Sequence, residues 1–390
     1  MVNASITDWI AERARELGFA MSGVVRAERF PELERNEDWL ARGYAGEMKY
    51  LEDVRRGDPQ KAMVGAQSVI VCALTYNTDY PRTAQPPTQT QGVASGAEPR
   101  GWISRYAWGD DYHEVLRAKL ADLLAGLREQ HREPFEARVY SDTGPLNERV
   151  LGKYAGLGWL GKNTLLLNER MGSYFFLGAI LTSLDLQPTL GQTDFPPPDR
   201  CGSCRKCIEA CPTGALVDAY VMDARTCISY LTIELRGAIP EDLREPMGHH
   251  VFGCDICQDV CPWNRNAPVT EAPEFQPRGY GRDSEAAGMK ACESAESLFQ
   301  PRLDWLVSLD EQKFREMFAG SPIKRTKWKG LMRNVCIALG NSAFARDSAA
   351  GKRAMKALRR LGECGEAMVV ESAQWAISRI QGNESGPEHF

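Results

Sequence analysis

Apolar and polar positions in the first half of the chain follow two different periods. Short apolar runs rich in β-branched and aromatic residues predict strands, and they lie at Phe19–Val25, Ser68–Leu74, Phe135–Tyr140 and Phe175–Leu181. Residues 6–17 and Tyr112–Gln130 instead repeat their apolar positions every three or four residues, which predicts helices. Strands that alternate with helices favour an α/β domain, which we place at residues 1–185.

The C-terminal part of the chain has no strand pattern. Its apolar positions predict amphipathic helices at Leu309–Ala319, Trp328–Leu339, Lys352–Leu361 and Ala367–Ile380. Residues 333–340 and 371–378 share a loose pattern, which predicts a short HEAT-like helical repeat over residues 291–390. Between the two regions, the proline-rich linker Asp194–Asp199 begins a third region, which we place at residues 186–290.

The composition is that of an ordinary globular protein, with 390 residues, 43% apolar and 25% charged. No apolar stretch approaches the length that crosses a membrane, and the N-terminus lacks the basic and apolar segments of a signal peptide. We therefore expect a cytoplasmic protein. The net charge of −5 does not by itself suggest a nucleic-acid partner, which would need a local basic patch.

Cysteine is the residue type whose distribution is unusual. The chain has 12 cysteines, and most of them fall between Cys201 and Cys261. Disulfides are rare in a reducing compartment, so a dense local group of cysteines indicates a metal site. The other four, which are Cys72, Cys292, Cys336 and Cys364, are scattered singly, and we interpret them as small apolar residues.

The cysteine spacing is that of a two-cluster bacterial ferredoxin. The run Cys201-x2-Cys204-x2-Cys207-x3-Cys211-Pro212 is followed by the shorter run Cys254-x2-Cys257-x3-Cys261-Pro262. In such proteins the last cysteine of each run serves the other cluster. The first cluster then takes Cys201, Cys204, Cys207 and Cys261. The second takes Cys211, Cys254 and Cys257, and Cys227 is the cysteine left in the region to complete it.

Two other interpretations of these cysteines carry less weight. Paired C-x2-C sequences often bind structural zinc, but zinc rarely uses a packed triple run that ends in Cys-Pro. A simple electron carrier would bind the clusters without needing the rest of this long chain. We therefore expect the clusters to deliver electrons to a site in the N-terminal region.

Asp142 is the candidate for that site. It follows the strand predicted at Phe135–Tyr140, and α/β proteins place active sites at strand ends. The tripeptide Asp142-Thr143-Gly144 also occurs in aspartic proteases, but those enzymes need two such aspartates, and this chain has one. On spacing alone, a turn residue that caps the next helix is an equally good interpretation of Asp142.

Several motifs together resemble one known family. They are Tyr140–Pro145 (YSDTGP), Ala155–Thr164 (AGLGWLGKNT), the eight-cysteine pattern, Leu231–Gly237 (LTIELRG), Cys254–Asn264 (CDICQDVCPWN) and Arg333–Asn341 (RNVCIALGN). They resemble the epoxyqueuosine reductases, cobalamin-dependent iron–sulfur enzymes that reduce epoxyqueuosine to queuosine at the wobble position of tRNA. The resemblance covers nearly the whole chain.

The resemblance implies a set of cofactor contacts. The N-terminal region would bind cobalamin with no histidine below the cobalt, near Arg56, Tyr106, Asp142, Asn163, Ser229, Cys254 and Asp255. His113 begins as in a D-x-H-x-x-G cobalamin motif, but Leu116 replaces its glycine, so we expect a structural histidine. Asp142 would be the proton donor, which requires a carboxylic acid with a raised pKa in an apolar pocket.

The resemblance also implies a tRNA partner that binds through its anticodon stem-loop. Candidate phosphate contacts are Arg236 and the basic run Lys324, Arg325, Lys327, Lys329 and Arg333. A second basic run comprises Lys352, Arg353, Lys356, Arg359 and Arg360, although basic runs are more often solvated helix faces. We expect a monomer supplied by an external low-potential electron donor. The alternative is a corrinoid and iron–sulfur reductase of a small molecule, similar to reductive dehalogenases.

Overall fold

A computed structural model describes residues 5–82, 98–191, 193–280 and 296–382. The N-terminal region is built on one four-stranded sheet with the order β1 (Met21–Arg26), β2 (Ser68–Thr75), β7 (Phe175–Thr182) and β4 (Ala137–Tyr140). These strands confirm the four that the apolar runs predict. All three pairings in the sheet are antiparallel, so the rule that places active sites at the ends of parallel strands does not apply to it.

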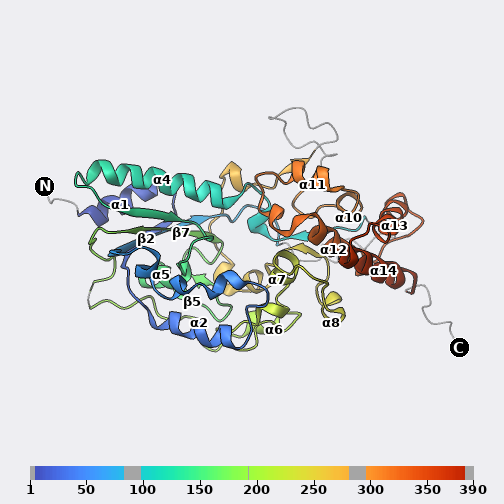
Figure 1. Ribbon diagram of the computed structural model, residues 1–390, viewed down its shortest axis with the longest axis horizontal. Coiled ribbons are helices and arrows are strands. Elements are labelled where there is room, and N and C mark those ends of the chain that lie inside the picture. Colours follow the sequence, from blue (N-terminus) through green and yellow to red (C-terminus); the bar gives the residue numbers. More distant parts are fainter. Residues whose placement is uncertain (1–4, 83–97, 192, 281–295, 383–390) are drawn as a thin grey trace.

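Helices cover both faces of this sheet (Figure 1). α1 (Ile6–Glu16) and α4 (Tyr112–Gln130) pack on one face, where they share a core with Ile70 and Cys72 of β2. The neighbouring β2 residues Val69 and Val71 point to the opposite face, where α2 (Pro31–Ala41) and α5 (Glu148–Tyr154) pack. Alternate residues of a strand point to opposite faces, which is why β2 is a continuous apolar run.

Short elements connect the sheet to the cysteine-rich region. α6 (Lys206–Glu209) lies within the first cysteine run, α9 (Ile256–Asp259) lies within the second, and the two helices are in contact. β3 (Trp102–Ile103) pairs in parallel with β8 (His250–Phe252) and so joins the N-terminal region to the cysteine-rich region. The other short elements are α3 (Pro59–Ala62), β5 (Trp159–Leu160), β6 (Leu166–Leu167), α7 (Ile228–Ile233), α8 (Glu241–Arg244), β9 (Gly279–Tyr280) and β10 (Glu296–Ser297).

The C-terminal region is helical, as its periodicity predicts, and it forms the right-hand end of the molecule in Figure 1. Its helices are α10 (Leu303–Leu306), α11 (Glu311–Met317), α12 (Lys327–Gly340), α13 (Ala349–Leu361) and α14 (Ala367–Gly382). α12 is buried from Gly330 to Gly340 and packs against α14. Among the described residues, no helix combines the length and the apolar character that a membrane span needs.

One hydrophobic core crosses the predicted domain boundaries. Ile103, Trp108 and Phe252 share a core with Leu331 of α12 and Ala376 of α14. The C-terminal helices therefore pack directly on the first two regions instead of forming a core of their own. The boundaries near residues 185 and 290 stay a prediction.

Candidate active site

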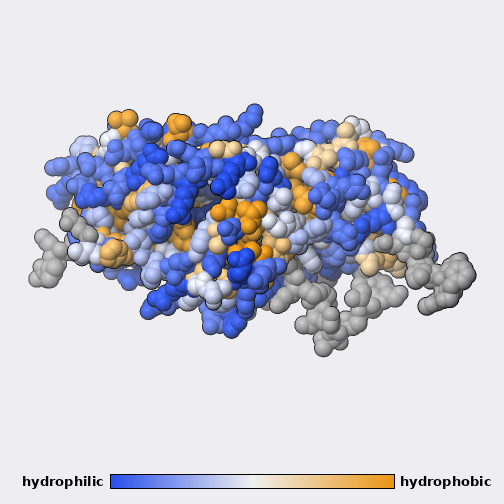
Figure 2. Space-filling model, turned by 90° about the horizontal axis from the view of Figure 1, so that it is seen from below, coloured by the Kyte–Doolittle hydropathy of each residue, from blue (hydrophilic) through white to orange (hydrophobic). Residues whose placement is uncertain are grey.

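A cavity of about 1770 Å³ lies between the sheet region and the cysteine-rich region. Its walls come from α2, the start of α4, the loop after β4, α5, the linker at Pro196–Asp199 and α7. Seen from below in Figure 2, the surface is hollowed near its middle, and apolar side chains lie in the hollow among hydrophilic ones. Segments that are far apart in sequence therefore build one site.

Asp142 stands in this cavity on a left-handed backbone with φ of 56°. This conformation is unfavourable for residues other than glycine and is found most often at functional sites. The Asp142 side chain is 63% exposed, because it faces the open cavity. The hydroxyl of Tyr112 donates a hydrogen bond to Asp142 Oδ2 at 2.7 Å, and His113 Nε2 lies 3.4 Å from the same oxygen.

The charge state of Asp142 differs from the sequence prediction. Loss of surrounding water raises the pKa of the carboxyl, but the contacts with His113 and Tyr112 outweigh this effect and lower the pKa to about 2. The expectation of a raised pKa at Asp142 is therefore wrong. Asp142 is a carboxylate here, and the proton of the pair lies on His113.

His113 is the residue that sequence reasoning underestimated. Its Nδ1 lies 2.6 Å from Asp111 Oδ1, so two carboxylates engage the two ring nitrogens. Burial lowers the pKa of His113, but hydrogen bonds to Asp111 and Asp142 raise it to about 9. Lys324 pairs with the other oxygen of Asp111 at 2.7 Å. The signal in the sequence was Asp-x-His at a helix start, where Asp111 caps α4 and turns His113 toward the cavity.

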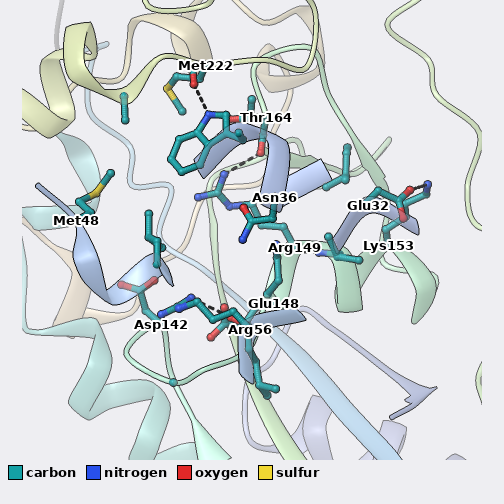
Figure 3. A pocket seen from close by; sticks show the side chains of 18 of the residues that line it. Glu32, Asn36, Met48, Arg56, Asp142, Glu148, Arg149, Lys153, Thr164 and Met222 are labelled. Atoms are coloured by element: carbon teal, nitrogen blue, oxygen red, sulfur yellow. Dashed lines mark hydrogen bonds and ion pairs between the residues drawn. The ribbon is translucent and has the colours of Figure 1, made fainter. Parts of the chain in front are cut away.

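Glu148, the first residue of α5, lines the same cavity and was also missed from the sequence. Figure 3 labels it with Asp142 and Arg56 at one end of the pocket. Its Oε1 is buried and has no hydrogen-bond partner among the described residues. Desolvation, with the nearby charge of Asp142, raises the pKa of Glu148 to about 8. The one sequence signal for Glu148 is its position three residues after the YSDTGP motif.

The residues expected near cobalamin divide into two groups. Arg56, Tyr106, Asp142 and Ser229 line the large cavity. Asn163, Cys254 and Asp255 are not among its lining residues, and their nearness to the cofactor stays a prediction. Asp255 instead accepts hydrogen bonds from the Ser104 hydroxyl and from the Arg105 backbone N–H, the latter at 2.7 Å. Asn163 donates to the Cys257 carbonyl at 3.3 Å and lines the smaller cavity described next.

The cysteines expected at the first cluster line a second cavity of about 220 Å³. Its walls include all four of them, Cys201, Cys204, Cys207 and Cys261. Cys261 comes from the other run, as the crossover prediction requires. Within the described residues, no three side chains of His, Cys, Asp or Glu are spaced to hold a single metal ion.

The cysteines expected at the second cluster also come together. The charge of Cys227 acts on Cys254 and Cys257, and the charge of Cys211 acts on Cys227 and Cys257. Burial raises the pKa of Cys227, Cys254 and Cys257. Cys227 also lines the large cavity, and it therefore links this group to Asp142.

The basic residues expected at a tRNA surface have different surroundings. Lys324, Arg325 and Lys329 are exposed and pair with Asp111, Glu234 and Glu366 respectively. Lys327 and Arg236 are also exposed. All five residues of the second run are exposed. Two of them also have partners, because Arg353 pairs with Asp304 and Arg360 donates to the Val307 carbonyl.

Arg333 requires a correction. It is 0% exposed, and its guanidinium donates hydrogen bonds to the carbonyls of Leu231, Leu235 and Gly237. Burial lowers the pKa of Arg333 to about 10. Arg333 therefore holds the segment after α7 onto α12 and does not face a nucleic acid. Sequence spacing misled the prediction, because α12 is buried on all sides from Gly330 to Gly340.

Comparison with known proteins identifies the family. Residues 56–143 match the family model "Epoxyqueuosine reductase QueG, DUF1730", and residues 200–264 match the 4Fe-4S double cluster binding domain. The epoxyqueuosine reductase of Pseudomonas aeruginosa is 38% identical over 379 residues, which cover 96% of this chain and 93% of the relative. The chain belongs to the epoxyqueuosine reductase family. The eight clustered cysteines lie inside the double-cluster match, so this family member has a 4Fe-4S binding domain.

Other epoxyqueuosine reductases agree with this assignment. The Escherichia coli enzyme is 37% identical over 334 residues, which cover 84% of this chain and 79% of the relative. A crystal structure of an epoxyqueuosine reductase with a tRNA-Tyr epoxyqueuosine-modified stem loop has a TM-score of 0.78 and 30% identity, covering 98% of this chain and 94% of that chain. The Streptococcus thermophilus structure has a TM-score of 0.76 and 29% identity, covering 97% and 91%.

Proposed function

We propose that this family member reduces epoxyqueuosine to queuosine at the wobble position of tRNA, with cobalamin and two 4Fe-4S clusters as cofactors. The observation that carries the proposal is one cavity whose wall includes the Asp142–His113 pair and Cys227 of the second cysteine group. An acid pair and an electron carrier thus face the same space. The relative crystallised with an epoxyqueuosine-modified stem loop supports a tRNA substrate.

The cavity fits a large amide-bearing corrinoid. Its volume of about 1770 Å³ exceeds the roughly 300–1,000 Å³ of an ordinary small-molecule site. Glu148 Oε1 and Thr164 Oγ1 are buried on its lining residues without partners among the described residues, and a polar cofactor could engage them. His113 is the one described histidine that lines the cavity, and both its ring nitrogens are engaged, so it is not suited to ligate cobalt from below.

When bound, the corrinoid supplies the low-valent cobalt that delivers electrons to the epoxide. Conversion of the epoxide to an alkene breaks both of its carbon–oxygen bonds, forms a carbon–carbon double bond and releases water. It requires two electrons and two protons. Asp142 is the proposed proton donor at the leaving oxygen, and His113 is positioned to return a proton to it. Tyr112 orients the Asp142 carboxylate through its hydrogen bond of 2.7 Å.

We propose that electrons travel from the first cysteine group to the second. The first group lies near solvent, because Gly202, Ser203 and Arg205 between its cysteines are exposed. The second group reaches the cavity through Cys227. An external low-potential donor would therefore reduce the first cluster, and the second would serve the cavity.

The finer domain assignment belongs to the same proposal. Residues 1–185 would form the α/β cobalamin-binding domain, residues 186–290 the ferredoxin-like domain, and residues 291–390 the HEAT-like domain that binds tRNA. The packing of α12 against α14, and of α13 against α14, supports a helical repeat. A cytoplasmic monomer is part of the same proposal.

A single-turnover assay tests the function. Anaerobic protein with its iron counted is loaded with cobalamin, reduced, and mixed with an epoxyqueuosine-bearing anticodon stem-loop. We expect conversion to queuosine and about eight irons per chain, because eight thiolates hold two cubanes. A fully loaded, reduced enzyme that leaves the stem-loop unchanged but reduces a halogenated phenol would favour the small-molecule alternative.

A further inference from the structure

Three carboxyl groups that line the large cavity have different partners. Glu32 accepts hydrogen bonds from Lys153 and from the Tyr154 hydroxyl, the latter at 3.0 Å. Asp142 is held by His113 and Tyr112. Glu148 differs from both, because its buried Oε1 has no hydrogen-bond partner among the described residues.

The basic groups near Glu148 are committed elsewhere. Arg56 Nη1 donates to the Leu146 carbonyl at 3.3 Å, and its Nε donates to the Tyr50 carbonyl at 3.2 Å. Arg149 donates to the Thr164 carbonyl at 2.8 Å. Neither arginine forms an ion pair with Glu148 in the described part of the chain. The negative charge of Asp142 opposes ionisation of Glu148. A backbone hydrogen bond of Glu148 and the charges of Arg56 and Arg149 favour ionisation but do not outweigh burial and Asp142.

A carboxyl in these surroundings is more stable in its neutral form. An ionised carboxylate with an unpartnered oxygen out of water is costly, and a like charge nearby adds to the cost. The pKa of Glu148 is accordingly raised to about 8, whereas hydrogen bonds to Lys153 and Tyr154 outweigh desolvation and lower the pKa of Glu32. Carboxyls whose pKa values are pushed apart in one site commonly divide the acid and base roles.

We propose that Glu148 is a second acid of this cavity and that it provides the second of the two protons which epoxide reduction consumes. One proton comes from the Asp142–His113 pair and the other from the Glu148 carboxyl, while the two electrons come from the reduced clusters through the cofactor. The oxygen leaves as water, and Glu148 regains its proton from solvent after turnover. This inference rests on the proposed function.

The first test needs neither cofactor nor substrate in the cavity. Infrared spectra of the cobalamin-free protein are recorded across pH for the wild type, Glu148→Gln and the matched control Glu32→Gln. We expect the wild type to have a protonated-carboxyl band at pH 7 that is lost with a midpoint of about 8. Glu148→Gln should lack this band, and Glu32→Gln should keep it. A wild-type spectrum identical to that of Glu148→Gln at pH 6 would overturn the proposal.

The second test uses enzyme loaded with iron and cobalamin in single turnovers of the epoxide stem-loop. The wild-type rate should fall as pH rises through about 8, and Glu148→Gln should be roughly a hundredfold slower and lack that fall. Cofactor content confirms that the variant is folded. If the wild type reacts and Glu148→Gln matches its rate and pH profile, the second-acid proposal fails alone. If the loaded wild type does not react, the proposed function fails, and the infrared test still decides the state of Glu148.

Discussion

At the scale of single residues, Asp142 and His113 share one proton, which the proposed reaction transfers to the leaving oxygen. Asp142→Asn keeps the shape of the side chain but cannot deliver a proton. We therefore expect single-turnover reduction to slow by roughly a hundredfold or more, because general acid catalysis is worth that much. The stem-loop affinity should change little, since a group that acts in the transition state affects turnover.

Asn also forms turns and tolerates the left-handed backbone that Asp142 adopts at φ of 56°. A residue with only a turn-forming role would therefore leave Asp142→Asn active. Near wild-type turnover by a variant with full iron and cobalamin would remove Asp142 from the mechanism. Iron and cobalt analysis of each preparation is the control.

The same pair predicts how stability depends on pH. The pKa of His113 rises from 6.5 to about 9 on folding, so its contribution is complete below pH 6.5 and is lost as pH rises through about 9. The pKa of Asp142 falls from 3.8 to about 2, so its contribution is complete above pH 3.8 and is lost as pH falls through about 2. The ion pair of Asp142 and His113 therefore contributes fully between pH 3.8 and pH 6.5.

We therefore expect His113→Asn to lower the melting temperature of the cobalamin-free protein by roughly 1–2 °C at pH 6, a small value because Asp142 is partly exposed to water. The difference from the wild type should shrink between pH 6.5 and pH 9. Melting curves of both proteins at several pH values test this predicted change. A difference that stays constant across that range would contradict the assigned protonation of His113.

At the scale of elements, periodicity predicts the helices well but not how the strands pair. The run at Ser68–Leu74 does not alternate between apolar and polar residues, because both faces of β2 are covered. Such a run does not indicate whether the neighbouring strands are parallel or antiparallel. Likewise, the buried Arg333 and the exposed Lys327 look alike in the sequence. The difference depends on the carbonyls after α7, which reach α12 only in the folded chain.

Two exposed basic residues, one at the start of α12 and one after α7, allow a test of the proposed tRNA surface. Lys327 is exposed, and Arg236 is exposed and donates to the Arg325 carbonyl at 3.2 Å. Replacing Lys327 and Arg236 together by Ala should weaken stem-loop binding and flatten its salt dependence by up to about one unit per lost phosphate contact. Lys313→Ala on α11 is the control. An unchanged salt slope would make these two residues part of a solvated face.

At the scale of the whole molecule, the sequence predicts one long-range contact of the site and not another. The crossover of Cys261 to the first group could be predicted, because the spacing of two-cluster proteins fixes which run supplies each ligand. The contact of His113 with Asp142 could not be predicted, because it depends on how α4 packs against the loop after β4. Spacing specifies ligands within a motif, whereas tertiary packing determines the surroundings of each acid.

Cys227 connects the clusters to the cavity and provides the last prediction. Its sulfur is the one proposed cluster ligand outside the two cysteine runs, and Cys227 borders the cavity that contains Asp142. Cys227→Ala should reduce the iron content by up to about four per chain, because one cubane loses a ligand and the other keeps all four. Electron delivery should then stop at the first cluster, since the carrier nearest the cavity is damaged.

The measurement is anaerobic iron analysis together with chemical reduction followed by single turnover. Cys364→Ala is a matched control, because Cys364 is a partly buried cysteine outside the cysteine runs. We expect Cys364→Ala to keep full iron and activity, and Cys227→Ala to keep a reducible first cluster but lose turnover. Full iron content in Cys227→Ala would mean that another ligand completes the second cluster. Full turnover in that variant would mean that electrons reach the cavity without passing through the second cluster.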